Sequence, residues 1–307
     1  MAKTFGLNRA GVLSRVTVAA ITAALVGTTT AAVAAEAPKS SAEAVETARP
    51  APGASAFATT GAASVTPVNA LYGVNNVGDI YGYGLTGSGG LTASEKTGYG
   101  FQYKKFVTQT DLDSNGHSDG VWFVENSRLY YGAWSSNGRD LGGGWNAYTR
   151  VFSPANVGGG TADDLLARDS SGVLWLYLGY NNGGLASRVK VGTGWNAYNQ
   201  ITGKGDLTGD GRADIVARDA SGVLWLYKGT GNYKAPFTTR SRVGSGWNLY
   251  NYLLSVGDMN NDGDADLVAR DSKGALWLYK GTGNPAAPYG GRVQIGTSGW
   301  NGFRLMF

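Results

Sequence analysis

The chain has 307 residues, of which 49 are Gly, 9 are Trp and 42% are hydrophobic. The hydrophobic content excludes a disordered chain, and abundant Gly without a Gly-X-Y period excludes collagen. Only 16% of the residues are charged, and such a Gly- and aromatic-rich composition is typical of β structure. The absence of Cys excludes disulfides, thiol nucleophiles and Cys-ligated zinc.

The N-terminal segment has the pattern of an export signal. Three cations precede an apolar stretch over residues 16–27, which leads to the small residues Ala32-Val33-Ala34. This pattern predicts a signal peptide over residues 1–34 and a secreted, extracellular protein. A membrane anchor needs about 20 apolar residues, and the Thr run at 28–30 ends this stretch earlier, so no membrane insertion is expected.

Without residues 1–34 the chain has 23 Lys+Arg against 22 Asp+Glu. This balance gives no electrostatic reason to expect a nucleic-acid partner. Residues 35–69 are rich in Ala, Pro, Ser and Thr, which predicts a flexible linker before a globular part over residues 70–307.

The globular part is a series of repeats. The segment GDLTGDGRADIVARDASGVLWLYKGTGN from Gly205 returns as GDMNNDGDADLVARDSKGALWLYKGTGN from Gly257, a period of 52 residues. A Gly-Trp-Asn element keeps the same step at Trp145, Trp195, Trp247 and Trp300. An earlier copy begins at Asn156 and fainter copies begin at Asp111 and Leu71, which makes five repeats of about 50 residues.

Each repeat contains four short strand candidates and no helical pattern. Five such units predict an all-β chain, a β-propeller of five four-stranded blades. The repeats contain four Asp-rich loops, at residues 111–119, 156–164, 206–214 and 258–266. If each loop joins one blade to the next, the fifth junction is where the termini meet, and residues 303–307 supply the last strand.

Three of these loops carry candidate calcium ligands. Alternating oxygen side chains around a Gly turn converge on a cation that takes six to eight oxygens. The candidate ligands are Asp111, Asp113, Asn115 and Asp119; Asp206, Thr208, Asp210 and Asp214; and Asp258, Asn260, Asp262 and Asp266. About three structural Ca²⁺ sites are therefore expected. The loop at 156–164 has Gly where ligands are needed, so it is expected to hold no metal, and Asp-Gly pairs also form turns without one.

These loops resemble those of FG-GAP and VCBS repeats, the calcium-binding repeats of certain β-propellers. The pattern D-x-[DN]-x-D-G-x-x-D followed by a strand carries the resemblance over residues 111–307, more weakly over 70–110. The Gly-Gly-Trp-Asn elements are also similar to tachylectin-type five-bladed propellers, a resemblance that implies sugar binding between blades.

The Gly-Trp-Asn elements also supply candidate carbohydrate ligands. An aromatic face beside amide and hydroxyl groups suits a sugar, although a Trp between blades also contributes by packing. The candidates are Trp145, Asn146, Tyr148, Trp195, Asn196, Tyr198, Trp247, Asn248, Tyr250, Trp300 and Asn301. By contrast, Trp175, Trp225 and Trp277 are predicted to be core residues. Arg168, Arg218 and Arg270 are predicted to form ion pairs with the Asp that follows each of them.

No set of catalytic residues stands out. The single His, His117, lies in an Asp-rich loop, so nucleophilic catalysis assisted by His lacks a base. Glycoside hydrolysis needs two carboxylates, and Glu125 is the candidate because it breaks the repeat at the turn position of Ala220, although a turn Glu is usually solvated. The sequence favours a non-catalytic protein that binds a carbohydrate or cell-surface glycan multivalently. A protein-binding or adhesive scaffold, and a secreted glycoside hydrolase, are the alternatives.

Overall fold

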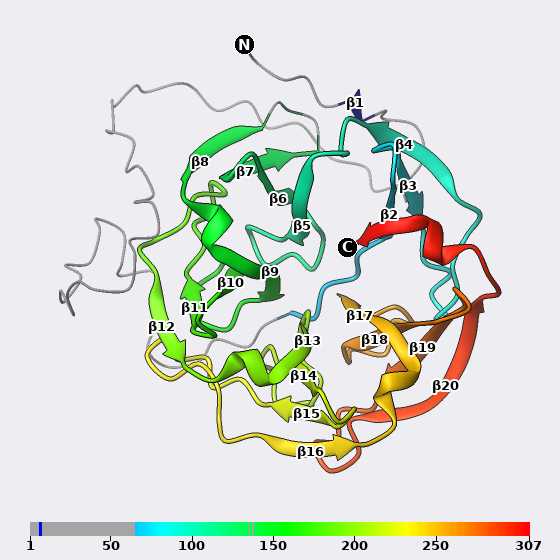
Figure 1. Ribbon diagram of the computed structural model, residues 1–307. Helices are drawn as coiled ribbons and strands as arrows, with labels where there is room; N and C mark the ends of the chain where they lie inside the picture. The colour runs from blue at the N-terminus through cyan, green and yellow to red at the C-terminus, as the bar shows by residue number, and fades with distance from the viewer. Residues whose placement is uncertain (1–5, 8–64, 135, 137) are drawn as a thin grey trace.

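Five antiparallel sheets surround a central axis in the computed structural model, which describes residues 6–7, 65–134, 136 and 138–307 (Figure 1). The chain is therefore a five-bladed β-propeller, as predicted. Apart from residues 6–7, the predicted signal peptide (1–34) lies outside the described residues, as does most of the predicted linker (35–69). Among the described residues, none forms a helix long and apolar enough to cross a membrane.

The strands of each blade follow one another in the chain, except in the first blade. The first blade contains β2 (Leu71–Asn75), β3 (Ile80–Tyr83), β4 (Glu95–Tyr99) and β21 (Phe303–Met306), and β1 (Gly6–Leu7) pairs with β4. The second contains β5 (Lys104–Thr110), β6 (Gly120–Glu125), β7 (Arg128–Ala133) and β8 (Arg139–Gly143). The third contains β9 (Tyr148–Ala155), β10 (Asp164–Asp169), β11 (Leu174–Tyr177) and β12 (Val189–Gly192).

The fourth blade contains β13 (Tyr198–Thr202), β14 (Ile215–Asp219), β15 (Leu224–Tyr227) and β16 (Ser241–Gly244). The fifth contains β17 (Tyr250–Gly257), β18 (Asp266–Asp271), β19 (Leu276–Gly281) and β20 (Tyr289–Gly296). Short 3-10 turns η2 (Trp145–Ala147), η3 (Trp195–Ala197), η4 (Trp247–Leu249) and η5 (Trp300–Gly302) join consecutive blades.

The ring closes within one chain. The C-terminal strand β21 pairs with β2, where Val74 lies opposite Leu305, and so becomes the innermost strand of the first blade. The predicted final strand is thus confirmed. Because the two ends share a sheet, the first blade has no unpaired inner edge.

The position of the Asp-rich loops differs from the prediction. Each loop joins the innermost strand of a blade to the second strand of the same blade, as loop 258–265 joins β17 to β18. The blades are joined instead by the 3-10 turns, except that residues 100–103 join the first blade to the second. The four loops still mark closure, because the missing fifth loop would lie between β21 and β2, where the chain has its two ends.

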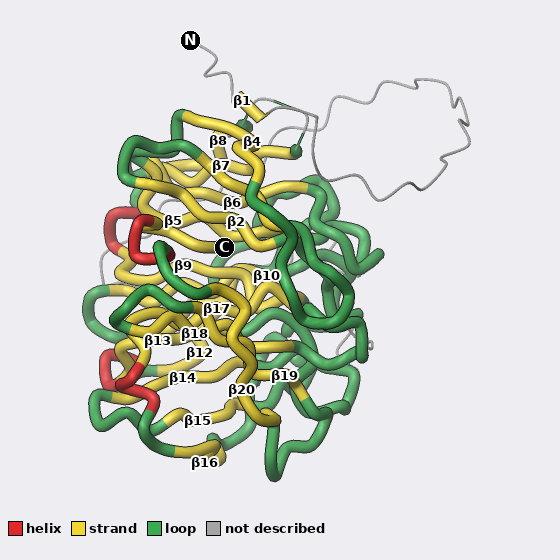
Figure 2. Tube along the Cα trace, turned by 90° about the vertical axis from the view of Figure 1, so that its right-hand side faces the viewer, coloured by secondary structure: helices red, strands yellow, loops and turns green. Residues whose placement is uncertain are grey.

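The 3-10 turns and the Asp-rich loops lie on opposite faces of the ring. Each turn comes just before an innermost strand and each loop just after it, and Figure 2 shows the turns gathered on one side. The tryptophans of the turns are buried between blades, where Trp145 packs with Leu129 of the second blade and Leu165 of the third. At the junction between the first two blades, buried Phe101 occupies the equivalent place after Gly100, whose φ of 86° matches the 88° of Gly144.

The segment at residues 65–69, named the strap here, crosses the face of the Asp-rich loops before β2 begins. The Val68 N–H donates to Gly116 O over 2.8 Å, and the Asp258 N–H donates to Pro67 O over 2.7 Å. The Asp206 N–H donates to Thr66 Oγ1 over 3.2 Å. One short segment therefore touches all three loops that carry candidate calcium ligands.

Candidate ligand and metal sites

The first and last acids of each Asp-rich loop organise its backbone. In the loop at 206–214, Asp206 accepts hydrogen bonds from the N–H groups of Thr208 and Gly209, both over 2.8 Å. Asp214 accepts from Leu207 N–H within the loop and from Gly229 N–H just after the third strand of the blade. Asp258 and Asp266 repeat this arrangement, and Asp111 and Asp119 repeat the contacts within the loop, so these carboxylates have a structural role independent of any metal.

The loop at 156–164 folds in the same way without the candidate ligands. Asn156 takes the first position, where its Oδ1 accepts from Gly159 N–H over 2.9 Å. Asp164 accepts from the N–H groups of Val157 and Gly158, and from Gly179 across the blade. The turn geometry alone is therefore no evidence for calcium.

Other observations bear on a cation in the remaining three loops. Ligand oxygens of Asp111, Asp113 and Asp119 lie within 4.8 Å of one another, close enough to share one ion. At the equivalent of the Asp113 position, the other loops have Thr208 and Asn260. Their Oγ1 and Oδ1 atoms are buried without a hydrogen-bond partner among the described residues. A buried acceptor of this kind costs free energy unless something binds it, so the donor set fits Ca²⁺.

Burial also perturbs these acids. Desolvation is the main cause that raises the pKa of Asp214 and Asp266, each to about 7. Burial, followed by repulsion from Asp163, raises the pKa of Asp111. A bound divalent cation would favour the ionised forms of carboxylates that contact it.

The predicted carbohydrate ligands divide into two groups. The indoles of Trp145, Trp195, Trp247 and Trp300 are buried, so these residues pack between blades. The side chains of Asn196 and Asn301 are exposed but donate to the carbonyls of Ser170 and Ser272, which fastens each 3-10 turn to a hairpin of the preceding blade. Asn248 does the same to the Ala220 carbonyl, and Asn146 is exposed.

Next to Trp195 lies an open pocket of about 310 Å³. Its lining includes Thr193, Trp195, Tyr198, Tyr227 and Arg240, and none of the described residues lining it is acidic. The Tyr198 and Tyr227 hydroxyls lie 2.6 Å apart, and Arg240 Nη1 donates to Tyr198 OH.

This constellation recurs at two neighbouring junctions. Tyr148 pairs with Tyr177 and Arg188, and Tyr250 pairs with Tyr279 and Arg292. The guanidinium of each Arg also stacks on a strand Trp, with centroid distances of 4.1 Å on Trp175, 4.0 Å on Trp225 and 4.3 Å on Trp277. These three Trp residues, predicted to be core, are only partly buried, and an Arg covers one ring face of each. The three Arg residues, 52 positions apart, were missed as site residues, although their step matches the repeat.

The other two junctions lack the constellation. At Trp300, Phe303 replaces the first tyrosine. The register of β3 and β4, compared with that of β15 and β16, shows that Ser94 takes the place of the Arg. At Phe101, Lys104 replaces the first tyrosine and lies over the Phe101 ring at 4.3 Å.

Glu125 is not a solvated turn residue. It is the last residue of β6, 5% exposed, opposite Lys104 in the register, and the two side chains form an ion pair at 3.8 Å. In the fourth blade the residue opposite Tyr198 is Asp219. By its register Glu125 is therefore the equivalent of Asp219, and not of Ala220 as the sequence alignment suggested. A carboxylate buried in an ion pair is poorly placed to act on a glycosidic bond.

The predicted Arg–Asp ion pairs in the turns are wrong. Arg168 Nη1 donates instead to the carbonyls of Trp195 and Tyr198, over 3.0 and 2.6 Å. The Asp169 carboxylate accepts from Trp175 Nε1 over 2.8 Å. Arg218 and Arg270 bind the carbonyls of the next junctions in the same way, which fixes each 3-10 turn to the preceding blade.

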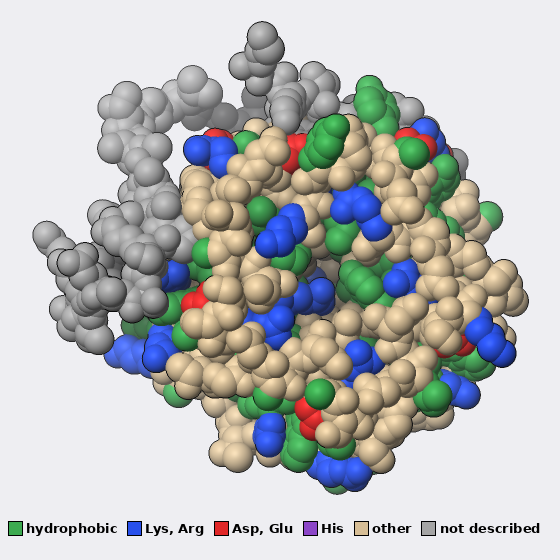
Figure 3. Space-filling model, in the orientation of Figure 1, with side chains coloured by type: hydrophobic (Ala, Val, Ile, Leu, Met, Phe, Trp, Pro, Cys, Tyr) green, Lys and Arg blue, Asp and Glu red, His purple; other side chains and the backbone are tan. Residues whose placement is uncertain are grey.

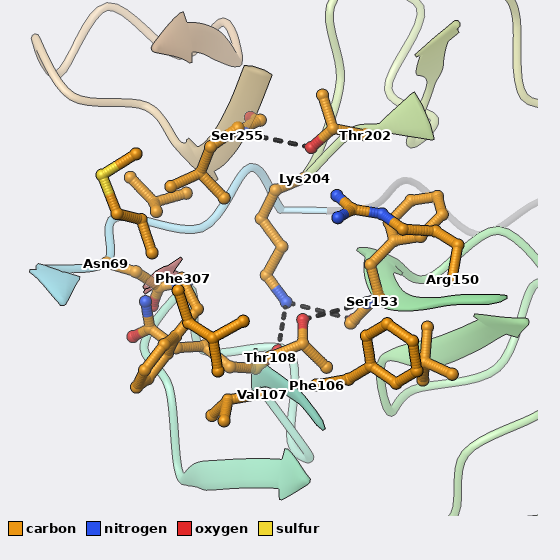
Figure 4. A pocket seen from close by; sticks show the side chains of 18 of the residues that line it. Asn69, Phe106, Val107, Thr108, Arg150, Ser153, Thr202, Lys204, Ser255 and Phe307 are labelled. Carbon is orange, nitrogen blue, oxygen red and sulfur yellow. Dashed lines mark hydrogen bonds between the residues drawn. The ribbon is translucent and has the colours of Figure 1, made fainter. Parts of the chain in front are cut away.

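The innermost strands enclose a small cavity on the ring axis, lined by both apolar and polar side chains (Figure 4). Buried Lys204 uses its three donors on Gln109 O, Ser153 Oγ and Asp163 Oδ2, at 2.9, 3.2 and 2.5 Å. The cavity measures about 40 Å³, and one water needs about 10–15 Å³ by the same kind of measure. It therefore has room for a few waters but not for a sugar ring.

The chain has limited similarity to known proteins. A family model described as FG-GAP-like repeat matches residues 206–269. No curated protein matches significantly. Among solved structures, the BP39L lectin from Burkholderia pseudomallei is 13% identical with a TM-score of 0.45, and the match covers 77% of this chain and 71% of that one.

Two further solved structures are similar at low sequence identity. An arginine-to-alanine mutant of AofleA from Arthrobotrys oligospora is 10% identical with a TM-score of 0.44, over 77% of this chain and 75% of that one. The Nup133 β-propeller domain of Vanderwaltozyma polyspora is 9% identical with a TM-score of 0.32, over 73% and 82%. No functional assignment follows from similarities this low.

Proposed function

We propose that the protein is a secreted, non-catalytic β-propeller that binds carbohydrate, stabilised by calcium in three loops. The observation that carries the proposal is the open pocket beside Trp195, whose constellation of two tyrosines and an arginine recurs at two neighbouring junctions. Its volume of about 310 Å³ lies at the lower end of the range for small-molecule sites, roughly 300–1,000 Å³. Aromatic walls with a few polar groups suit a sugar, which has both C–H faces and hydroxyls.

Three similar constellations on one ring favour a polymeric ligand. A chain with several weak sites gains avidity on a surface that displays the same sugar repeatedly. The test is a glycan array and a cell-wall pull-down of the chain without residues 1–35. Saturable binding with about three sites per folded chain supports the proposal, whereas no binding to any glycan overturns it.

A protein ligand gives a different result in the same experiment. A captured protein that free sugars do not displace would favour the scaffold alternative. Cleavage of a glycan that is abolished in Glu125→Gln would favour the hydrolase, which the ion pair with Lys104 argues against.

Calcium would be held by the ligand sets at 111–119, 206–214 and 258–266, where it would supply only structural cross-linking. Extracellular calcium modules bind at about 10⁻⁴–10⁻³ M, so 1 mM Ca²⁺ would add about 0.4–1.4 kcal/mol per site to the free energy of unfolding. We expect chelation to lower the melting temperature and Asp113→Asn to remove part of that effect. Thr161→Ala, in the loop without ligands, is the matched control and should respond to calcium like the parent.

A further inference from the structure

The Arg240 pocket and the two constellations that repeat its contacts each contain an arginine, and we propose that their ligand is an anionic saccharide whose carboxylate or phosphate pairs with Arg188, Arg240 and Arg292. This inference rests on the proposed function, since it names the class of sugar that the same pockets would take.

The guanidinium is held in place before any ligand arrives. Arg240 lies 4.0 Å from the centroid of Trp225 and donates through Nη1 to Tyr198 OH. A guanidinium has five N–H donors, and the two tyrosine hydroxyls of the pocket can occupy only some of them. The rest of a planar fork fixed on an aromatic face is suited to two parallel hydrogen bonds with an oxyanion.

None of the described residues that line the pocket is acidic. Asp219, which lies outside that lining, is the acid that acts on Arg240, and its carboxylate accepts from Trp225 Nε1 over 2.8 Å and from the Ser221 and Val223 N–H groups. Arg242 lies opposite Trp225 in the register of β15 and β16, and paired residues share a face of a sheet. Arg242 therefore adds a second cation to the face of the sheet on which Arg240 stacks against Trp225.

The tyrosines add donors but no negative charge. Burial raises the pKa of Tyr227, and burial followed by the Tyr250 hydrogen bond raises the pKa of Tyr279 to about 12. Both phenols are therefore neutral at physiological pH. Figure 3 shows Lys and Arg side chains spread over the face that carries the 3-10 turns, with few acidic side chains among them.

The repeat predicts how many sites bind the anion and which of them bind it more tightly. The Lys190 and Gln294 side chains occupy the place of Arg242 in the other two pockets. The Arg188 and Arg240 pockets should therefore bind an anion more tightly than the Arg292 pocket. The junction at Trp300, with Ser94 and Phe303, should not bind.

The test measures dissociation constants on immobilised polygalacturonate, on poly(glycerol phosphate) and on neutral dextran. The triple variant Arg188→Gln/Arg240→Gln/Arg292→Gln is compared with Lys96→Gln/Lys234→Gln/Lys273→Gln, which removes the same net charge from exposed sites elsewhere. Circular dichroism confirms that each variant is folded. If the triple variant does not fold, the single variant Arg240→Gln is used instead. It should lower the number of polyanion-binding sites per chain from about three to two.

We expect the parent chain to bind at least one polyanion about ten- to hundred-fold more tightly than the triple Arg variant, because a charge-assisted pair is lost at each pocket. Binding should weaken as salt rises from about 0.05 to 0.5 M, and the Lys variant should match the parent. The two polyanions show whether the acid group is a carboxylate or a phosphate. Equal affinity of the triple Arg variant, or preference for neutral dextran, overturns the inference while sugar binding stands. No binding to any glycan overturns the proposed function as well.

Discussion

Lys204 and Asp163 form a buried ion pair that occurs once in the ring. Their side chains are 3% and 5% exposed, and Asp163 also accepts from the Asp111 N–H of the neighbouring blade. At the equivalent of Asp163 the later repeats have Ala213 and Ala265. The pair thus joins three blades through contacts that the repeat does not supply elsewhere.

Removal of one partner leaves the other charge buried and uncompensated. We expect Lys204→Met to lower the free energy of unfolding by about 3–5 kcal/mol, measured by urea denaturation. In a double-mutant cycle, Asp163→Asn should cost much less on the Lys204→Met background than on the parent. Additive costs would show that the pair does not interact.

Asp164 should make stability depend on pH. Burial raises its pKa to about 7 in the folded chain, above the ordinary value of about 3.9 that we assume for the unfolded chain. The folded state therefore holds the Asp164 proton more tightly than the unfolded state. The resulting contribution to the free energy of unfolding is fully present below about pH 4 and is lost as pH rises through about 7.

With chelator present, the free energy of unfolding should fall by about 1–3 kcal/mol between about pH 5 and 8. Asp164→Asn, which keeps the shape and cannot titrate, should flatten part of this slope. An unchanged slope would mean that Asp164 is ionised throughout that range.

At the scale of elements, the strap at residues 65–69 depends on close backbone approach. A Cβ at Gly257, which has a φ of 113°, would lie 1.8 Å from Pro67 O. At Gly299, which has a φ of 88°, the space around a Cβ is open to 4 Å. Both positions strain an L residue, but only the first also displaces the strap.

We therefore expect Gly299→Ala to cost about 1 kcal/mol and Gly257→Ala to cost clearly more. Chemical denaturation gives the two values, and limited proteolysis near residue 65 reports whether the strap is released. Equal costs with equal proteolysis would show that the strap does not need this contact.

The repeat period was enough to predict the blades and strands, but not which strand starts a blade. A repeat has no intrinsic beginning, so the same period fits an Asp-rich loop between blades or within one. Phe101 escaped the Gly-Trp-Asn pattern because any large apolar ring fills that place between blades. The pair of Lys204 and Asp163 is separated by 41 residues and occurs once, so no pattern in the sequence indicates it.

At the scale of the whole molecule, the ring depends on its last strand. β21 supplies the inner edge of the first blade, and Phe307 is buried with Val74 and Phe123. Removal of residues 303–307 would expose one edge of β2 and part of the core. We expect this truncated chain to unfold without a single cooperative transition and to aggregate, measured by thermal scanning and light scattering. A sharp transition like that of the full chain would contradict the role given to β21.

The strap also fixes the direction from which the preceding chain reaches the ring. Because residues 65–69 lie against the Asp-rich loops, the segment before Val65 joins on the face opposite the 3-10 turns. A fluorophore, bead or biosensor surface attached through that segment should therefore leave the turn face, with its three arginine pockets, oriented outward. Attachment through Phe307 would start from a buried residue of the ring and should disturb closure.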